Sequence, residues 1–137
     1  MIRIKWIDPG EEGTPKHIEG ELRGKTIVLF KGRAKDLTEA HERAHIALGH
    51  YRHKRFSPER YVRGELDANL YTYKKMGKPR RLIMELRGLL EDLEESWDMS
   101  NKEGLKFISQ GFKVLGDKIP VGWSRDLERL RSEVYAS

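Results

Sequence analysis

The chain has 137 residues and a formal net charge of +5, and hydrophobic and charged residues make up 37% and 36% of it. This length suits one domain with a single core, and the composition excludes a largely disordered chain. Cysteine is absent, which excludes disulfides and thiolate metal sites, and no apolar run approaches the roughly 18 residues that a membrane span needs. We therefore expect one cytoplasmic domain over residues 1–137, without a membrane partner.

The N-terminal part predicts a small β-sheet. Residues 2–6 alternate apolar and basic side chains, which is typical of a half-buried strand, and they lack the apolar run of a signal peptide. Residues 17–22 and 26–30 are two further candidate strands, joined by a tight turn at Arg23 and Gly24. The run 26–30, TIVLF, is the stronger candidate because it is β-branched and aromatic. It is also the candidate for edge pairing with an extended substrate.

Helical periodicity dominates the rest of the chain. The first predicted helix runs from the N-cap Asp36 to the stop at Gly49, and the second runs from Ser57-Pro58 to an end near Gly77 and Pro79. Three more are predicted over about 80–98, over 100–115 from Ser100, and from the cap Ser124 to about 135. Residues 50–56 form a basic connector between the first two. Strands followed by helices predict an α+β fold, with a small N-terminal sheet or hairpin, an active-site helix and a helical C-terminal half.

The first predicted helix contains the motif His41-Glu42-x-x-His45. Positions i and i+4 share one helix face, so the two imidazoles can bind one metal ion. The glutamate beside the first histidine can then take a proton from water held by the metal. The alternative is a solvated helix surface. Both histidines, however, fall on the side of Leu37, Ala44 and Leu48, which should face the core, and unpartnered imidazoles would be costly there. A third ligand is needed to support the site.

Three candidates for that ligand can be compared. A metzincin places a histidine ten residues after His41, but Tyr51 occupies that position. The second candidate is His50 or His53 in an irregular arrangement. The third is Glu65 on the next predicted helix. We favour Glu65 as the ligand over a merely solvated charge, and His50 then has no assigned role.

Asn69 accompanies Glu65 at the helical spacing i, i+4, so the two side chains share a face. From that position Asn69 can hydrogen-bond a ligand histidine from behind. Tyr71 and Tyr73 are nearby candidates for stabilising an oxyanion, but tyrosines at this spacing are more typical of a core or its rim.

The segments LTEAHERAHIALGH and ELDANLY together resemble the ImmA/IrrE family of zincin-like metallopeptidases. The family combines H-E-x-x-H, often continued to a Gly-His pair, with a downstream E-x-x-A-N, and the wider gluzincin group uses a similar spacing for its third ligand. The resemblance covers about residues 17–75. It departs after Leu70, where the family usually has phenylalanine and two alanines, and this affects the substrate groove more than the metal site. It implies a cytoplasmic metallopeptidase whose protein targets include DNA-binding repressors or antitoxin-like proteins.

The sequence thus predicts a zinc-dependent metalloendopeptidase acting on a protein or peptide substrate. His41, His45 and Glu65 bind Zn²⁺, Glu42 is the general base, and Asn69 supports a ligand. Residues 1–79 form the metallopeptidase-like core, and residues 80–137 form a helical extension without a recognisable motif.

The alternative function is a nucleic-acid-associated or regulatory interaction protein whose metal site is structural or vestigial. Residues 50–81 carry ten Lys or Arg against three Asp or Glu, so a basic surface for nucleic acid is one interpretation and a solvated rim is the other. Separately, the scarcity of Asn and Gln beside abundant Lys, Arg and Glu resembles proteins of thermophiles.

Overall fold

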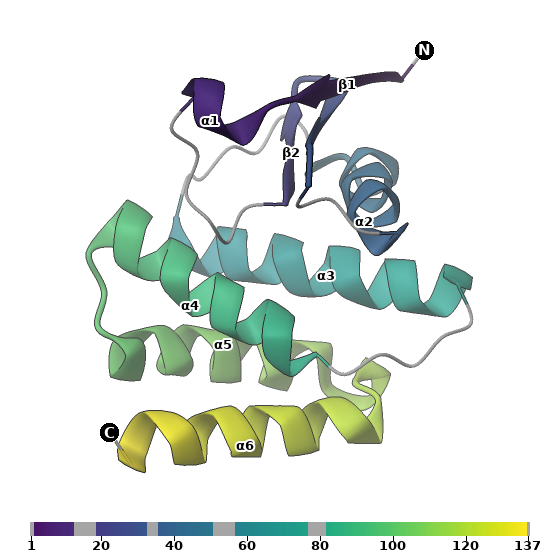
Figure 1. Cartoon of the computed structure of the whole chain (residues 1–137). Coiled ribbons are helices and arrows are strands. Elements are labelled where there is room, and N and C mark those ends of the chain that lie inside the picture. Colours follow the sequence, from purple (N-terminus) through teal and green to yellow (C-terminus); the bar gives the residue numbers. More distant parts are fainter. Residues whose placement is uncertain (1, 13–18, 33–35, 51–56, 77–81, 137) are drawn as a thin grey trace.

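The structure is a computed structural model that describes residues 2–12, 19–32, 36–50, 57–76 and 82–136. The elements are β1 (Arg3–Ile7), α1 (Pro9–Glu12), β2 (Gly20–Arg23), β3 (Thr26–Phe30), α2 (Asp36–Ala47), α3 (Pro58–Met76), α4 (Ile83–Trp97), α5 (Asn101–Leu115), the 3₁₀ turn η2 (Gly116–Lys118) and α6 (Val121–Ala136). A small three-stranded sheet followed by helices makes the chain α+β, as predicted (Figure 1). Within these described ranges, no helix combines the length and apolar character needed to cross a membrane.

The sheet has the order β1-β3-β2, with β1 parallel and β2 antiparallel to β3. The predicted hairpin is confirmed, and Gly24 takes a φ of 61° in its turn, a left-handed conformation that glycine adopts without strain. Residues 27–30 of β3 are buried, because this strand lies in the centre of the sheet. The prediction that β3 offers an edge to a substrate is therefore wrong: β1 and β2 pair with it on either side, and they form the edges.

Helix α2 packs closely against the hairpin at Gly20. A Cβ atom at this position would lie 2.8 Å from Cγ2 of Thr38 and 2.9 Å from the carbonyl oxygen of Val28. Only glycine therefore fits between the helix and the central strand. The hydroxyl of Thr38 also donates a hydrogen bond to the carboxylate of Glu19, at 3.3 Å. These contacts fix the first turns of α2 beside β2.

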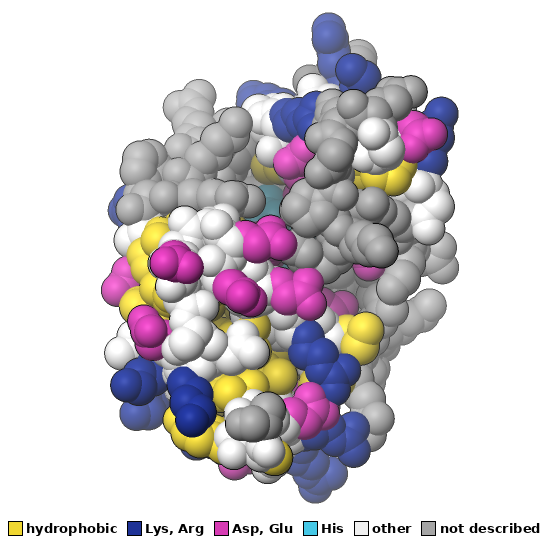
Figure 2. All heavy atoms as spheres, turned by 60° about the vertical axis from the view of Figure 1, so that its left-hand side comes forward, with side chains coloured by type: hydrophobic (Ala, Val, Ile, Leu, Met, Phe, Trp, Pro, Cys, Tyr) yellow, Lys and Arg dark blue, Asp and Glu magenta, His cyan; other side chains and the backbone are white. Residues whose placement is uncertain are grey.

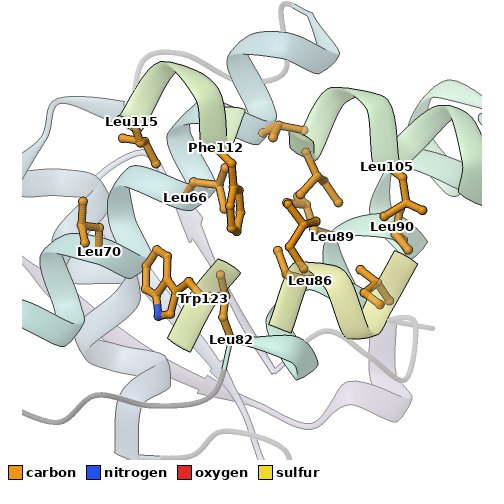
Figure 3. Packing of buried hydrophobic residues seen from close by; sticks show 14 of the residues in the cluster. Leu66, Leu70, Leu82, Leu86, Leu89, Leu90, Leu105, Phe112, Leu115 and Trp123 are labelled. Carbon is orange, nitrogen blue, oxygen red and sulfur yellow. The ribbon is translucent and has the colours of Figure 1, made fainter. Parts of the chain in front are cut away.

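Helix α3 crosses the middle of the molecule, with the sheet and α2 on one side and α4, α5 and α6 on the other (Figure 1). Its predicted apolar stripe is confirmed, since all four members are buried: Val62, Leu66, Leu70 and Tyr73. This stripe faces the helical half, where Leu66 lies close to Phe112 of α5 (Figure 3). The opposite side of α3 is left for contact with α2.

Two glycines let α5 approach its neighbours. A Cβ at Gly111 would lie 2.7 Å from Cδ1 of Leu66 on α3, and one at Gly104 would lie 2.7 Å from Cδ2 of Leu90 on α4. Both separations are shorter than any normal carbon contact, so the helices touch through the glycine backbone. The helical half is thus packed directly against the helix that carries Glu65.

The helix starts agree only in part with the sequence. Ser100 caps α5 as predicted, because its hydroxyl accepts a hydrogen bond from the Glu103 N–H at 3.2 Å. The predicted cap Ser124 is wrong, because α6 already begins at Val121. The N–H of the buried Trp123 bonds the Pro120 carbonyl at 3.0 Å, which closes the first turn three residues earlier.

A short helix that we did not predict from the sequence follows β1. Helix α1 is a single turn at Pro9–Glu12. The side chain of Asp8 accepts a hydrogen bond from the N–H of Gly10 at 3.0 Å. This is the local capping bond that aspartate commonly provides at a helix start.

Candidate metal centre

Two histidines of α2 and one glutamate of α3 meet between the two helices. Nε2 of His41 lies 3.1 Å from Nε2 of His45 and 2.8 Å from Oε2 of Glu65. Nε2 of His45 lies 3.3 Å from Oε1 of the same carboxylate. The helical spacing i, i+4 brings the two rings together, and the packing of α2 on α3 supplies the carboxylate. The structure therefore brings together the three side chains that the sequence predicted as ligands.

The separations of these atoms fit a zinc ion. Tetrahedral zinc with bonds of about 2.0–2.1 Å holds its ligand atoms about 3.3–3.4 Å apart. The two ring nitrogens lie 3.1 Å apart, and the two carboxylate oxygens of Glu65 lie 2.8 Å from Nε2 of His41 and 3.3 Å from Nε2 of His45. Shifts of about half an ångström would give the separations around a zinc ion. Two imidazole nitrogens and a carboxylate oxygen are also donors that zinc binds in catalytic sites. The residues present thus fit the ion.

Glu42 lies beside this group and is buried, with 8% of its surface exposed. Ligand atoms of His41, Glu42 and His45 all lie within 4.8 Å of one another, so Glu42 is a second candidate for the third ligand. Glu65 lies within 2.8 Å of His41 and 3.3 Å of His45, and its hydrogen bonds to both histidines favour it in that role. Glu42 is then close enough to act on a group at the centre without being a ligand.

The electrostatics tie His41 and Glu65 into an ion pair. Burial lowers the pKa of His41, but the carboxylate of Glu65 outweighs it, and the pKa rises from 6.5 to about 9. Burial likewise raises the pKa of Glu65, but His45 and His41 outweigh it and hold that pKa well below 4.5. Each partner therefore stabilises the charged form of the other.

Glu42 behaves differently from Glu65. Burial is the largest influence and raises the pKa of Glu42, while His41 and His45 oppose this rise and Glu65 and Glu21 add to it. Two carboxylates at one site thus have pKa values displaced in opposite directions. A carboxylate with a raised pKa has greater affinity for a proton, which is what a general base requires.

Asn69 lies one turn after Glu65 on α3 and is buried, with 7% exposed. Its side chain hydrogen-bonds His41 and raises the pKa of that imidazole. Asn69 thus acts on His41, and its support of a bound metal ligand stays a prediction. Tyr73, by contrast, packs edge-on against Trp123 of α6, with ring centroids 5.4 Å apart, and belongs to the helical core.

His50 is the residue whose role the sequence missed. Its Nδ1 lies 2.9 Å from Nδ1 of His45, on the side of the ring away from the Nε2 atoms. It is therefore a neighbour of a candidate ligand rather than a candidate third ligand, although we assigned it no role from the sequence. The other alternative ligand, His53, lies outside the described residues.

The group is accessible from at least one side. In the space-filling view a histidine side chain is visible at the bottom of a hollow, with acidic side chains at part of its rim (Figure 2). Among the described residues the histidines are His41, His45 and His50, so the visible ring belongs to this group. The side chain of His41 is 20% exposed and that of Glu65 is 24% exposed. The side chains of His41 and Glu65 are thus partly open to solvent.

Comparisons with known proteins found no relative of the chain. No family model, no curated protein and no solved structure matches the chain. Support for a function therefore comes from the side chains of the chain itself and from their arrangement between α2 and α3.

Proposed function

We propose that the protein is a zinc-dependent metallopeptidase of the zincin type. The observation that supports this most strongly is the convergence of His41, His45 and Glu65 within 3.3 Å of one another, beside the buried Glu42. Two histidines on one helix turn, a glutamate from the next helix and a neighbouring free carboxylate are the parts that hydrolysis of an amide bond requires.

Each residue of the site has a distinct role in the proposed reaction. His41, His45 and Glu65 hold the ion, and Asn69 keeps the His41 ring in place through its hydrogen bond. When bound, zinc would polarise the scissile carbonyl and acidify water held beside it. The carboxylate of Glu42 would take a proton from the attacking water and deliver it to the leaving amine. Burial favours this by raising the affinity of Glu42 for a proton.

The substrate we propose is an extended segment of a protein. Strand β2 is an edge of the sheet and lies next to α2, so an extended chain can add to it by main-chain hydrogen bonds. This replaces β3, which is the central strand. The resemblance to ImmA/IrrE peptidases favours cytoplasmic cleavage of a regulatory or DNA-binding protein, and that choice of target is part of the proposal.

The metal is tested first, by zinc analysis of purified protein. We expect about one zinc per chain, lost in His41→Ala and in Glu65→Gln. The exposed Glu39, paired with Arg43 on the outer side of α2 at 3.0 Å, supplies the control, and Glu39→Gln should keep the full zinc content. Zinc that is substoichiometric in the wild type and indifferent to both site variants would rule out the centre.

The base is tested by Glu42→Gln, assayed against a library of unstructured peptides. We expect this variant to keep its zinc and to lose about 10²–10⁴-fold in cleavage rate. The control Glu39→Gln changes the same type of residue one turn earlier, and it should keep both the zinc content and the cleavage rate of the wild type. Equal cleavage by Glu42→Gln and the wild type would remove Glu42 from its role. Zinc-loaded protein that cleaves nothing but binds DNA with a steep salt dependence would favour the nucleic-acid alternative.

A further inference from the structure

A hydrogen-bonded pair of histidines closes the end of α2. Nδ1 of His45 and Nδ1 of His50 lie 2.9 Å apart, with ring planes tilted by 57° and centroids 5.2 Å apart. A hydrogen bond between two ring nitrogens needs one N–H and one lone pair. One of the two Nδ1 atoms therefore carries a hydrogen, and the other accepts it.

The predicted role of His45 as a metal ligand decides which nitrogen donates. Nε2 of His45 lies 3.1 Å from Nε2 of His41 and 3.3 Å from Oε1 of Glu65, so Nε2 is the atom that would bind the ion. A nitrogen that binds a metal uses its lone pair and carries no hydrogen. The neutral ring of His45 would then carry its hydrogen on Nδ1 and donate it to His50.

We propose that His50 is a positioning residue for the metal centre. By accepting from Nδ1–H of His45, it fixes the ring in the tautomer whose Nε2 lone pair faces His41 and Glu65. This is the form in which Nε2 can bind a metal, and a metal-binding histidine commonly needs such a partner for its other nitrogen. The inference rests on the proposed metal centre and assigns it a residue that the predicted ligand set omits.

The backbone around His50 holds its ring against His45. Gly49 takes a φ of 76°, which turns the chain out of α2 and back across the end of the helix. On the other side, the His50 ring lies over Gly64 of α3, where an added Cβ would be 3.6 Å from Nδ1 and 3.7 Å from Cε1. The ring is thus held between the end of α2 and the helix that supplies Glu65.

Zinc affinity, measured by competition with a chromogenic chelator, tests the role. His50→Phe keeps a ring over Gly64 but offers no acceptor, whereas the side-chain oxygen of His50→Asn can occupy the place of Nδ1. We expect zinc to bind about 10–100-fold more weakly to His50→Phe and to His50→Ala, and within about 3-fold of the wild type to His50→Asn. Leu48→Ala, at an exposed position two residues earlier, should change nothing.

A cobalt spectrum supplies a second readout that loss of stability would not change. Co²⁺ in the wild type and in His50→Asn should give the same visible absorption, and His50→Phe should give a shifted or weaker band because the His45 ring is no longer fixed. If His50→Phe fails to fold, judged by circular dichroism, His50→Ala replaces it in both measurements.

The outcomes separate this inference from the function on which it rests. A wild-type protein that binds no zinc overturns both. Zinc bound by the wild type and, with equal affinity, by the variants without an acceptor overturns the role of His50 alone. The same holds if His50→Asn loses as much affinity as His50→Phe, because an acceptor would then make no difference. Rescue by asparagine supports the proposal.

Discussion

The ion pair of His41 and Glu65 makes the metal-free protein sensitive to pH. The raised pKa of His41, about 9 against 6.5, contributes stability that is complete below pH 6.5 and is lost as the pH rises through 9. The lowered pKa of Glu65 contributes stability above pH 4.5 that is lost as the pH falls. The pair therefore stabilises the fold most between about pH 4.5 and 6.5.

Glu65→Gln should reveal this window when unfolding by urea is measured with a chelator present. We expect a loss on the order of 3 kcal/mol near pH 6, a much smaller loss at pH 10, and a loss that shrinks progressively as the pH falls below 4.5. Glu39→Gln removes an exposed pair with Arg43 and should cost less than about 1 kcal/mol at any pH. A loss for Glu65→Gln that does not vary with pH would show that the pair is not charged in the folded state.

The residues of the centre differ in how far the sequence could predict them. The convergence of His41 and His45 follows from helical spacing alone. Glu65 required a second motif, because only the packing of α2 on α3 brings it to the histidines. His50 could not be placed, since it lies beyond the last helical turn and its direction depends on the left-handed backbone of Gly49. The one local signal was the Gly-His pair itself, to whose histidine we assigned no role.

Among the elements, α5 depends on glycine where it touches α3. A Cβ at Gly111 would lie 2.7 Å from Cδ1 of Leu66 and 3.3 Å from Cγ1 of Val62, and Leu66 is fully buried. Gly88 on α4 has nothing within 4 Å of its Cβ position. The same substitution should therefore have opposite effects at the two glycines.

We expect Gly111→Ala to lower the free energy of unfolding by about 1–3 kcal/mol, because the strain exceeds the gain in helix propensity. Gly88→Ala should raise it by up to about 1 kcal/mol, since only the propensity changes. Urea unfolding of the two variants checks both signs. Stabilisation by Gly111→Ala would mean that the two helices can move apart without loss.

Local signals predicted most elements but not their arrangement. Apolar periodicity located α3, α4 and α5, and the TIVLF run located β3, because those patterns reflect burial of one face or of a whole strand. The order of the strands depends on pairing between β1 and β3, which are separated by the hairpin strand β2, and no short-range pattern specifies it. The start of α6 was misplaced because burial of Trp123 and the turn at Pro120 outweighed the capping preference of Ser124.

At the scale of the whole molecule, the candidate metal centre lies between a small layer, formed by the sheet and α2, and the larger helical half. The sheet contributes a buried cluster of Ile7, Val28 and Phe30, whereas the cluster built from α3, α4, α5 and α6 is far larger. Less buried apolar surface means a smaller free energy for local opening. The sheet and α2 should therefore open before the helical half, and a metal held by α2 and α3 should join the two.

Hydrogen exchange measured with and without zinc checks this expectation. In metal-free protein, amides of the sheet and α2 should exchange at lower opening free energies than amides of α3 to α6. Zinc at about 1,000 times its dissociation constant should add about 4 kcal/mol of protection to α2, and none in His45→Ala. Uniform protection in the metal-free protein would contradict the two-layer description.

The central claim is that His41, His45 and Glu65 bind one zinc ion while Glu42 stays free to act as a base. Anomalous diffraction at the zinc edge from zinc-loaded crystals tests it most directly. We predict a single peak about 2.0–2.2 Å from Nε2 of both histidines and from a carboxylate oxygen of Glu65, with Glu42 not bonded to it. The absence of ordered zinc, or zinc bound by Glu42 with Glu65 turned away, would contradict the claim.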